Sequence, residues 1–207
     1  MILSQLSGGF DSVASTLLIA ESGEEFSCLF IDYDQPYVLQ EQRACIYVNE
    51  FLKQKYENYK GLEIARIPLK LNSQEVKEYV PIRNLVLGAL SANFALASNS
   101  QTIAVGTKTT EVRKDDAYSF SDCSIKFWEL MSHICSYASE DKTIQFITPL
   151  IKNNVALTKK EVIDIIVNSG INIKHLWTCY GNADKHCGVC HHCKEIIKAG
   201  YWEDLER

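Results

Sequence analysis

No apolar run in the sequence is long enough to cross a bilayer, and no charged-then-apolar leader precedes its first apolar segment. Internal repeats and low-complexity stretches are also missing. Positive charge is not in excess, because the formal net charge is −5, which argues against broad attraction to nucleic acid or to an anionic membrane. These absences predict a globular cytoplasmic protein with neither a membrane nor a nucleic-acid partner.

Cysteine is the residue type whose distribution is unusual. Four of the 8 cysteines are scattered along the chain, and the other four, Cys179, Cys187, Cys190 and Cys193, crowd near its C-terminal end. In a chain without a secretory leader, clustered cysteines favour a metal site over a disulfide framework.

Short apolar segments typical of buried strands alternate with segments of helical periodicity over most of the chain. This alternation predicts an α/β protein with a parallel sheet and helices on both faces. We expect strands within 2–6, 24–34, 61–69, 102–106 and 143–150, and helices over 13–20, 38–56, 83–98, 125–139 and 158–170. Gly170 is the expected C-cap of the last of these helices.

The composition changes to Cys, His, Gly and Lys after about residue 171. We therefore expect two units, an α/β domain over 1–171 and a small metal-binding module over 172–207. The polar stretch 108–121 follows Gly106 at the end of a predicted strand and is the expected flexible loop. Open α/β sheets place their ligand sites at such strand ends.

The sequence LSGGFDS, from Leu6 to Ser12, lies between the first predicted strand and a predicted helix. It fits the pattern Ser-Gly-Gly-x-Asp-Ser of the pyrophosphate-binding loop in N-type ATP pyrophosphatases. Gly8 and Gly9 let the backbone approach phosphates, Ser7 and Ser12 add hydroxyl donors, and Asp11 can hold magnesium or orient the loop. The alternative is a plain strand-to-helix turn in which Ser7 caps the helix. No lysine follows the glycines, which excludes a P-loop of the Walker type.

A cation is needed near the loop because cleavage of ATP between its α and β phosphates releases pyrophosphate. Lys159, at the start of the last long predicted helix, is our candidate for that cation. The alternative is a solvated lysine on a helix face.

The cysteine cluster has the spacing Cys-x7-Cys-x2-Cys-x2-Cys. Four thiolates can close a tetrahedral zinc site with no open position, which predicts one structural zinc per chain held by Cys179, Cys187, Cys190 and Cys193. His186, His191 and His192 compete as ligands. Unligated thiols and redox pairs are the alternatives.

Taken together, the motifs resemble the 7-cyano-7-deazaguanine synthase family of the queuosine pathway. The resemblance runs in order along nearly the whole chain: LSGGFDS (6–12), DYDQ (32–35), YVPIRNLVL (79–87), SDCSIKF (121–127), PLI (149–151), TKKE (158–161) and TCYGNADKHCGVCHHC (178–193). It implies the Rossmann-like fold of the adenine nucleotide α-hydrolase (HUP) type plus a C-terminal zinc module. It also implies magnesium-bound ATP as co-substrate, and family members are often dimers, so we expect a homodimer.

The family's reaction is the adenylation of the carboxylate of 7-carboxy-7-deazaguanine, attack by ammonia to give an amide, and ATP-driven dehydration to the nitrile. By resemblance, substrate contacts are expected from Arg83, Asn84, Tyr33 and Gln35. The remaining expected site residues are, for ATP, Leu6, Ser7, Gly8, Gly9, Phe10, Asp11, Ser12 and Gly106, and, for catalysis, Asp11, Ser12, Lys159 and Asp122.

The chain departs from the family pattern in the segment 122–127, where Ser124, Ile125 and Lys126 replace an arginine, a proline and a glutamate. Asp34 also replaces the glycine of the family's Asp-Tyr-Gly-Gln segment. These changes fall where the incoming nitrogen is expected, so attack by an amine of a partner protein, as in antiviral relatives, stays open beside ammonia. A third alternative is an inactive nucleotide-binding interaction module.

Overall fold

The computed structural model describes residues 1–69, 80–109, 120–140, 142–181 and 184–206. Its main feature is a parallel sheet with the strand order β3-β2-β1-β4-β5. The strands are β1 (Ile2–Gln5), β2 (Phe26–Asp32), β3 (Tyr59–Arg66), β4 (Thr102–Ala104) and β5 (Gln145–Ile147). The central strand β1 pairs through Ser4 with Cys28 on one side and with Ala104 on the other.

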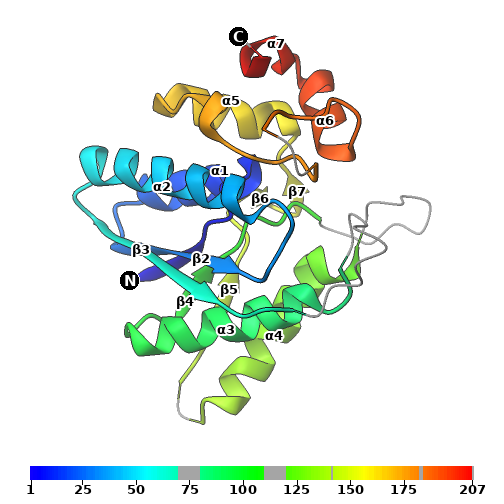
Figure 1. The fold of residues 1–207 in the computed structure, drawn as a ribbon. Helices are drawn as coiled ribbons and strands as arrows, with labels where there is room; N and C mark the ends of the chain where they lie inside the picture. The colour runs from blue at the N-terminus through cyan, green and yellow to red at the C-terminus, as the bar shows by residue number, and fades with distance from the viewer. Residues whose placement is uncertain (70–79, 110–119, 141, 182–183, 207) are drawn as a thin grey trace.

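Helices cover both faces of the sheet, which confirms the predicted fold class (Figure 1). One face carries α1 (Phe10–Ala20), α2 (Val38–Lys55) and α5 (Lys159–Ser169), and the other carries α3 (Arg83–Ala97) and α4 (Ile125–Ala138). Among the helices that the structure describes, none combines the length and the apolar character needed to cross a membrane.

Each face has its own apolar core. On the first face, Val13 and Leu17 of α1 pack with Val48 of α2 and Ile166 of α5. On the second face, Ala92 of α3 and Trp128 and Met131 of α4 pack against strand residues such as Ile103. Because β1 is covered on both faces, its neighbouring residues Ile2 and Leu3 are both buried, one in each core.

The order of the strands creates a topological switch point. The chain moves from β1 through α1 to β2 on one side, whereas β4 lies on the other side of β1. Ligands of open α/β sheets bind in the crevice outside the carboxyl ends of the strands at such a point. The carboxyl ends of β1 and β4 are followed by the two segments that the sequence singles out, residues 6–12 and Gly106.

Helix α5 begins and ends as its sequence predicts. Thr158 and Glu161 form a reciprocal capping box, and Gly170 adopts the left-handed conformation (φ 97°) as the C-cap. The hairpin just before it was not predicted. It joins β6 (Ile151–Lys152) to β7 (Val155–Ala156) through Asn153 and Asn154, both with positive φ.

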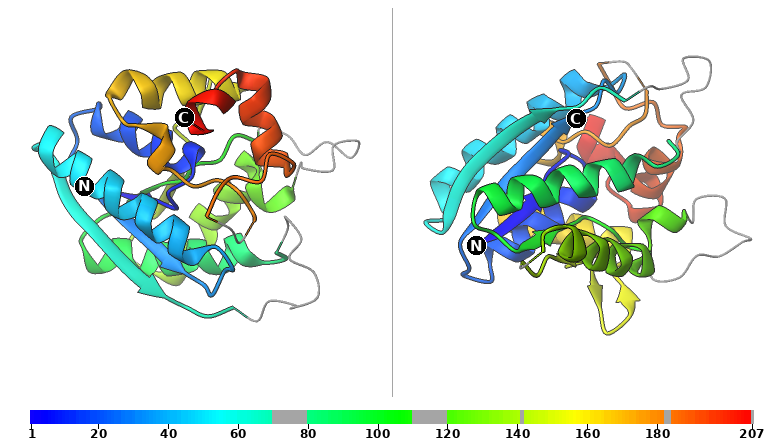
Figure 2. Two further views of the ribbon diagram at one scale, coloured as in Figure 1. Left: turned by 45° about the horizontal axis from the view of Figure 1, so that its top comes forward. Right: turned by 90° about the horizontal axis from the view of Figure 1, so that it is seen from below.

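The C-terminal part packs on the α/β domain rather than standing apart from it. It comprises a 3₁₀ turn (Ile173–His175), α6 (His191–Ala199) and α7 (Trp202–Glu206), and α6 packs beside α5 (Figure 1 and the left view of Figure 2). Ile196 of α6 joins the core of the first face. The backbone N–H of Trp177 donates to the carbonyl of Gly8 at 3.0 Å, so the C-terminal part contacts the glycine loop directly.

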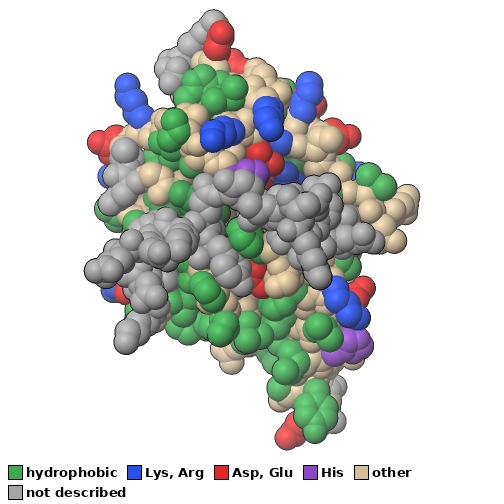
Figure 3. Space-filling model, turned by 90° about the vertical axis from the view of Figure 1, so that its right-hand side faces the viewer, with side chains coloured by type: hydrophobic (Ala, Val, Ile, Leu, Met, Phe, Trp, Pro, Cys, Tyr) green, Lys and Arg blue, Asp and Glu red, His purple; other side chains and the backbone are tan. Residues whose placement is uncertain are grey.

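The surface carries exposed apolar side chains. Leu130, Ile134 and Tyr137 leave an exposed apolar stripe along α4. The face shown in Figure 3 carries hydrophobic side chains over its lower part and Lys and Arg side chains over its upper part.

Two expectations from the sequence are not tested by the structure. The homodimer stays a prediction, and most of the expected loop 108–121 lies outside the described residues.

Candidate functional site

Hydrogen bonds between its own serines shape the loop after β1. The backbone N–H and the hydroxyl of Ser7 both donate to Ser12 Oγ at 3.1 Å, and Ser12 Oγ donates to the carbonyl of Gly9 at 2.9 Å. Gly9 is the N-cap of α1, with no side-chain hydrogen bond to the first turn. Ser7 therefore does not cap the helix, and the N-terminus of α1 is available to an anion.

Two glycines are required here by the packing of the backbone. Gly8 has a φ of +76°, and a Cβ on it would lie 2.7 Å from Ala44 Cβ. Gly106, after β4, lies so close to the loop that a Cβ would come within 2.8 Å of Ser12 N. Gly106 thus allows the segment after β4 to touch the loop after β1 at the switch point.

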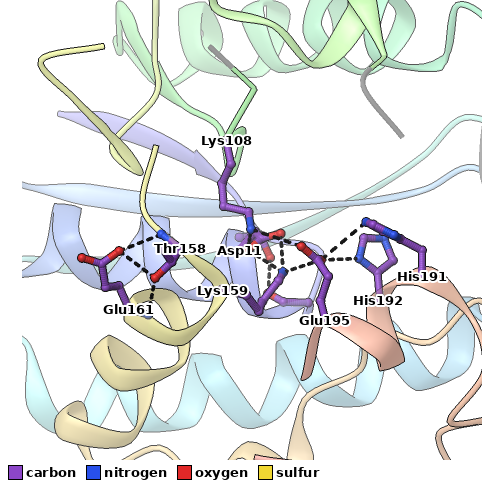
Figure 4. Close-up of polar contacts among 10 residues, drawn as sticks. Asp11, Lys108, Thr158, Lys159, Glu161, His191, His192 and Glu195 are labelled. Atoms are coloured by element: carbon purple, nitrogen blue, oxygen red, sulfur yellow. Dashed lines mark hydrogen bonds and ion pairs between the residues drawn. The ribbon is translucent and has the colours of Figure 1, made fainter. Parts of the chain in front are cut away.

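Two lysines and two carboxylates meet beside the loop (Figure 4). Lys159 Nζ donates to both oxygens of Asp11 at 2.9 Å and lies 3.3 Å from Glu195 Oε2. Lys108 Nζ lies 3.7 Å from Asp11 Oδ1 and 3.8 Å from Glu195 Oε1. The four side chains come from α1, the segment after β4, α5 and α6, so the fold and not the local sequence brings them together.

Burial and opposite charge compete in this cluster. Burial alone would raise the pKa of Asp11, but Lys159 and Lys108 hold it below its ordinary value. Burial alone would lower the pKa of Lys159, but Asp11 and Glu195 raise it. The pKa of Glu195 is likewise low despite its burial, because His192, Lys159 and Lys108 stabilise the carboxylate. Asp11, Lys159 and Glu195 are therefore charged at neutral pH.

A cavity of about 260 Å³ extends from the loop toward the N-terminus of α3. Ser7, Gly9, Asp11, Ser12 and Gly106 line one part of it. Another part is lined by polar and aromatic side chains, among them Tyr33, Tyr37, Glu41, Arg83, Asn84 and Tyr180. Of the predicted ATP-binding residues, all but Gly8 line this cavity, Leu6 and Phe10 included. Of the predicted substrate residues, Tyr33, Arg83 and Asn84 line it, whereas Gln35 does not.

Arg83 and Asn84 begin α3 and differ in what they can offer a ligand. The amide of Asn84 donates to the carbonyl of Asp122 at 3.0 Å and to Cys123 Sγ at 3.3 Å, and accepts from Arg83 Nε at 3.2 Å. Asn84 is therefore engaged in holding the segment 122–123, and its contact with a purine stays a prediction. The guanidinium carbon of Arg83 lies 6.0 Å from the centre of the Tyr33 ring.

Asp122 and Cys123 lie beside Arg83. Asp122 is buried, its Oδ2 has no hydrogen-bond partner within the described chain, and burial raises its pKa. Ser124 N-caps α4 by accepting from Phe127 N. Lys126 points outward, with 75% of its side chain exposed, and lies 3.8 Å from Glu129. Of the two residues that depart from the family pattern here, Ser124 therefore caps a helix and Lys126 lies on the surface.

The four clustered cysteines converge as predicted. Their Sγ atoms all lie within 4.8 Å of one another, a grouping that can hold a metal ion. Backbone N–H groups of Gly181 and Cys187 donate to Cys179 Sγ at 3.2 and 3.3 Å, and that of Cys190 donates to Cys187 Sγ at 3.3 Å. Such bonds stabilise thiolates, the form that binds a metal.

Several residues at the site were not among the predicted ones. They are Lys108, Glu195, Glu41, Tyr37, Tyr180 and His192. Only Lys108 has a sequence signal, because it follows Gly106 at a strand end. In the sequence, nothing distinguishes Glu195 and Glu41 from solvent-exposed acidic residues of a helix.

The parallel sheet, the loop at its switch point and the C-terminal cysteines define an α/β protein of the N-type ATP pyrophosphatase class. The family described as "Queuosine biosynthesis protein QueC" matches residues 1–203, and the chain belongs to this family.

Curated relatives agree with this assignment. The 7-cyano-7-deazaguanine synthase of Gloeothece citriformis is 28% identical over 96% of this chain and 91% of its own length. That of Campylobacter hominis is 27% identical over 93% of this chain and 91% of its own length. Among solved structures, the U34-tRNA thiolase NcsA from Methanococcus maripaludis with its [4Fe-4S] cluster has a TM-score of 0.53 at 13% identity, covering 99% of this chain and 67% of that chain. The last comparison supports the fold alone.

Proposed function

We propose that the protein is an ATP-dependent ligase that adenylates the carboxylate of 7-carboxy-7-deazaguanine and transfers the acyl group to nitrogen. The observation that carries the proposal is the shared cavity, which is lined both by the glycine loop and by Arg83, whose guanidinium suits a carboxylate. Lys159 stands beside this cavity, bonded to Asp11 of the loop. The names of the curated relatives supply the 7-deazaguanine skeleton and the nitrile product, and the acid is the one that the family's reaction implies.

The chemistry follows from what these groups can bind. A carboxylate oxygen of the acid attacks the α-phosphorus of ATP, the bond to the β-phosphate breaks, and pyrophosphate leaves. The backbone of the loop, the N-terminus of α1, Lys159 and Lys108 supply positive charge where pyrophosphate departs. Magnesium enters with ATP. Ammonia then attacks the carbonyl carbon and AMP leaves, giving an amide. The amide oxygen attacks the α-phosphorus of a second ATP with release of pyrophosphate, and it then leaves as AMP while the nitrogen loses its protons, giving the nitrile.

Zinc is the metal we propose for the cysteine cluster. Four thiolates at about 2.3 Å from one tetrahedral ion lie about 3.8 Å apart. Cys187 Sγ and Cys193 Sγ lie 3.9 Å apart, and no pair of the four exceeds 4.8 Å. A [4Fe-4S] cluster needs a wider spacing, because irons and sulfides stand between the cysteine sulfurs. Held by all four cysteines, zinc would stabilise the C-terminal part and would have no coordination position left for catalysis.

Product analysis tests the ligase proposal. The protein is incubated with ATP, the acid and ammonium, and we expect AMP, pyrophosphate and the mass of the nitrile. Release of ADP and phosphate would contradict the pyrophosphate-loop assignment. AMP release without a free amide or nitrile, together with a mass adduct on a protein encoded beside this one, would instead favour a protein amine as acceptor. Absence of any AMP would favour the inactive interaction module.

A further inference from the structure

Glu41 is a carboxyl at the cavity for which adenylation has no use. It lies in the first turn of α2, and the cavity is lined by Glu41 together with Tyr33 and Arg83. Its Oε2 accepts a hydrogen bond from Gln35 Nε2 at 2.6 Å. The amide of Gln35 is fixed in this orientation, because its Oε1 accepts from the backbone N–H of Tyr33 at 2.9 Å. A built network therefore holds Glu41 in place.

The carboxyl of Glu41 has no ion-pair partner in the part of the chain that the structure describes. Arg83 lies close enough to lower its pKa, although burial dominates and raises that pKa to about 8. The Arg83 guanidinium and the Glu41 carboxyl thus line one cavity, and no ion pair between them stabilises the carboxylate in the described part of the chain. The ionised form of Glu41 is therefore costly unless a ligand supplies hydrogen-bond donors.

We propose that Glu41 recognises the donor edge of a guanine-type base, accepting hydrogen bonds from its ring N–H and its exocyclic amino group. This inference rests on the proposed function. In the acid considered above, those two donors lie on the six-membered ring, and the reacting carboxylate lies on the opposite, five-membered ring. Arg83 would meet the carboxylate while Glu41 meets the donors, so the two protein charges match the two ends of one substrate.

The adenine of ATP does not match this arrangement. Its edge offers one donor and one acceptor, whereas a carboxylate only accepts. The ribose also separates adenine from its phosphates, so no anion lies on the far side of the base ring to pair with Arg83. Glu41 is thereby a specificity-determining residue for the acid and not for the nucleotide.

The substitution Glu41→Gln distinguishes recognition of the acid from recognition of the adenine of ATP. Glutamine keeps the shape of the side chain and can still accept from Gln35, but it replaces one acceptor by an amino group that opposes the donors of the base. We expect affinity for the guanine-type acid to fall by about 10- to 100-fold, as for the loss of a paired base contact. Glu50→Gln, on the exposed side of the same helix, is the matched control.

Binding is measured by calorimetry with two probes, 7-carboxy-7-deazaguanine and the analogue that lacks the exocyclic amino group. The wild type and E50Q are expected to prefer the guanine-type acid by about 10-fold or more, and E41Q is expected to lose this preference. Glu41→Asp, which withdraws the carboxylate by one methylene, is expected to weaken the preference for the guanine-type acid. This variant provides the test if E41Q fails to fold.

Equal binding of both probes by the wild type would overturn the inference, as would an unchanged preference in E41Q. A weaker affinity of E41Q for ATP alone would assign Glu41 to the nucleotide and overturn it as well. If the wild type binds neither acid but binds ATP, the proposed function itself is wrong, and this result is distinct from the others.

Discussion

Glu195 Oε2 of α6 lies 3.3 Å from Lys159 Nζ of α5. Glu195 follows the last of the clustered cysteines by two positions, and Lys159 bonds to Asp11 of the loop 6–12. The C-terminal part therefore contributes a charge beside this loop, in addition to the backbone bond from Trp177 to Gly8. The geometry of the proposed metal centre and the charge balance of the proposed ATP site are thus linked.

Replacing Lys159 tests this charge balance. In Lys159→Met, Asp11 and Glu195 lose the nearer of the two lysines that lie between them, and we expect a loss of about 3 kcal/mol in the free energy of unfolding because the cluster is largely buried. AMP formation should also fall strongly, since the loop loses the cation bonded to Asp11. Chemical denaturation and an AMP assay measure the two effects.

Lys160→Met is the matched control. Lys160 is the next residue and is 64% exposed; it pairs with Asp164 in the same helix and lies 5.9 Å from the centre of the Tyr201 ring. Because these contacts are at the surface, we expect neither stability nor AMP formation to change measurably. If K159M were as stable and as active as K160M, the role of the buried cation would be refuted.

The metal centre gives a second prediction. We expect about one zinc per chain by elemental analysis, and Cys187→Ser should lose the zinc, the order of α6 and, through Glu195, much of the AMP formation. Cys135→Ser, a partly exposed cysteine of α4 outside the cluster, should keep all three. Iron with inorganic sulfide, or a folded protein free of metal, would show that the zinc assignment is wrong.

The features that could be predicted from sequence are those that neighbouring residues determine. The loop from Ser7 to Ser12 forms its bonds within six positions, and Gly170 and Thr158 cap their helix locally. The clustered cysteines also lie close in sequence. The hairpin at Asn153 and Asn154 had a signal of the same local kind, since two consecutive asparagines tolerate the positive φ of a tight turn.

Long-range contacts account for the rest. Lys108 and Glu195 meet Asp11 only because β4 pairs with β1 and α6 packs on α5. Glu41 reads as a first-turn acid of an amphipathic helix, and its burial at the cavity depends on the packing of α2. No local pattern distinguishes these acids from solvated ones, so their role follows from the tertiary structure.

The glycines at the switch point give a third prediction. Gly106→Ala places a Cβ 2.8 Å from the backbone of Ser12, which cannot move without moving the loop, and we expect a cost of about 2 kcal/mol in stability. Gly9→Ala should cost little, because its φ is −82° and its nearest contact would be 3.4 Å away. G9A should nevertheless reduce AMP formation, since the new methyl group stands at the phosphate-binding loop. Equal melting temperatures of G106A and G9A would contradict this reading.

The pKa of Glu41 predicts how stability depends on pH. Burial raises this pKa to about 8, so between pH 5 and 8 the folded chain holds a proton that the unfolded chain has lost, and stability falls as pH rises. Glu41→Gln removes this dependence. We expect E41Q to be more stable than the wild type at pH 8 by on the order of 2 kcal/mol, and nearly equal to it at pH 5.

Other groups facing Glu41 do not produce the same effect. Burial raises the pKa values of Tyr33, Tyr37 and Cys45, so these groups keep their protons up to pH 8, and Arg83 stays charged. Denaturation curves at pH 5, 6, 7 and 8 for the wild type, E41Q and the exposed control E50Q provide the measurement. A gap between E41Q and the wild type that stays constant with pH would mean that Glu41 is ionised throughout.

The nitrogen step gives the last prediction. The lysine that replaces an acid in the segment 122–127 would repel ammonium if it faced the cavity, but Lys126 is 75% exposed. We therefore expect Lys126→Gln to leave nitrile formation unchanged.

Asp122 is the acid that we expect to act in this step. It is buried beside Arg83 with an unpartnered oxygen, and a carboxylate of raised pKa can take a proton from ammonium. Asp122→Asn should slow nitrile formation by about 100-fold while pyrophosphate release in the first turnover persists. Rapid-quench assays of both products separate the two steps, and an equal loss of pyrophosphate release and nitrile in D122N would place Asp122 in adenylation instead.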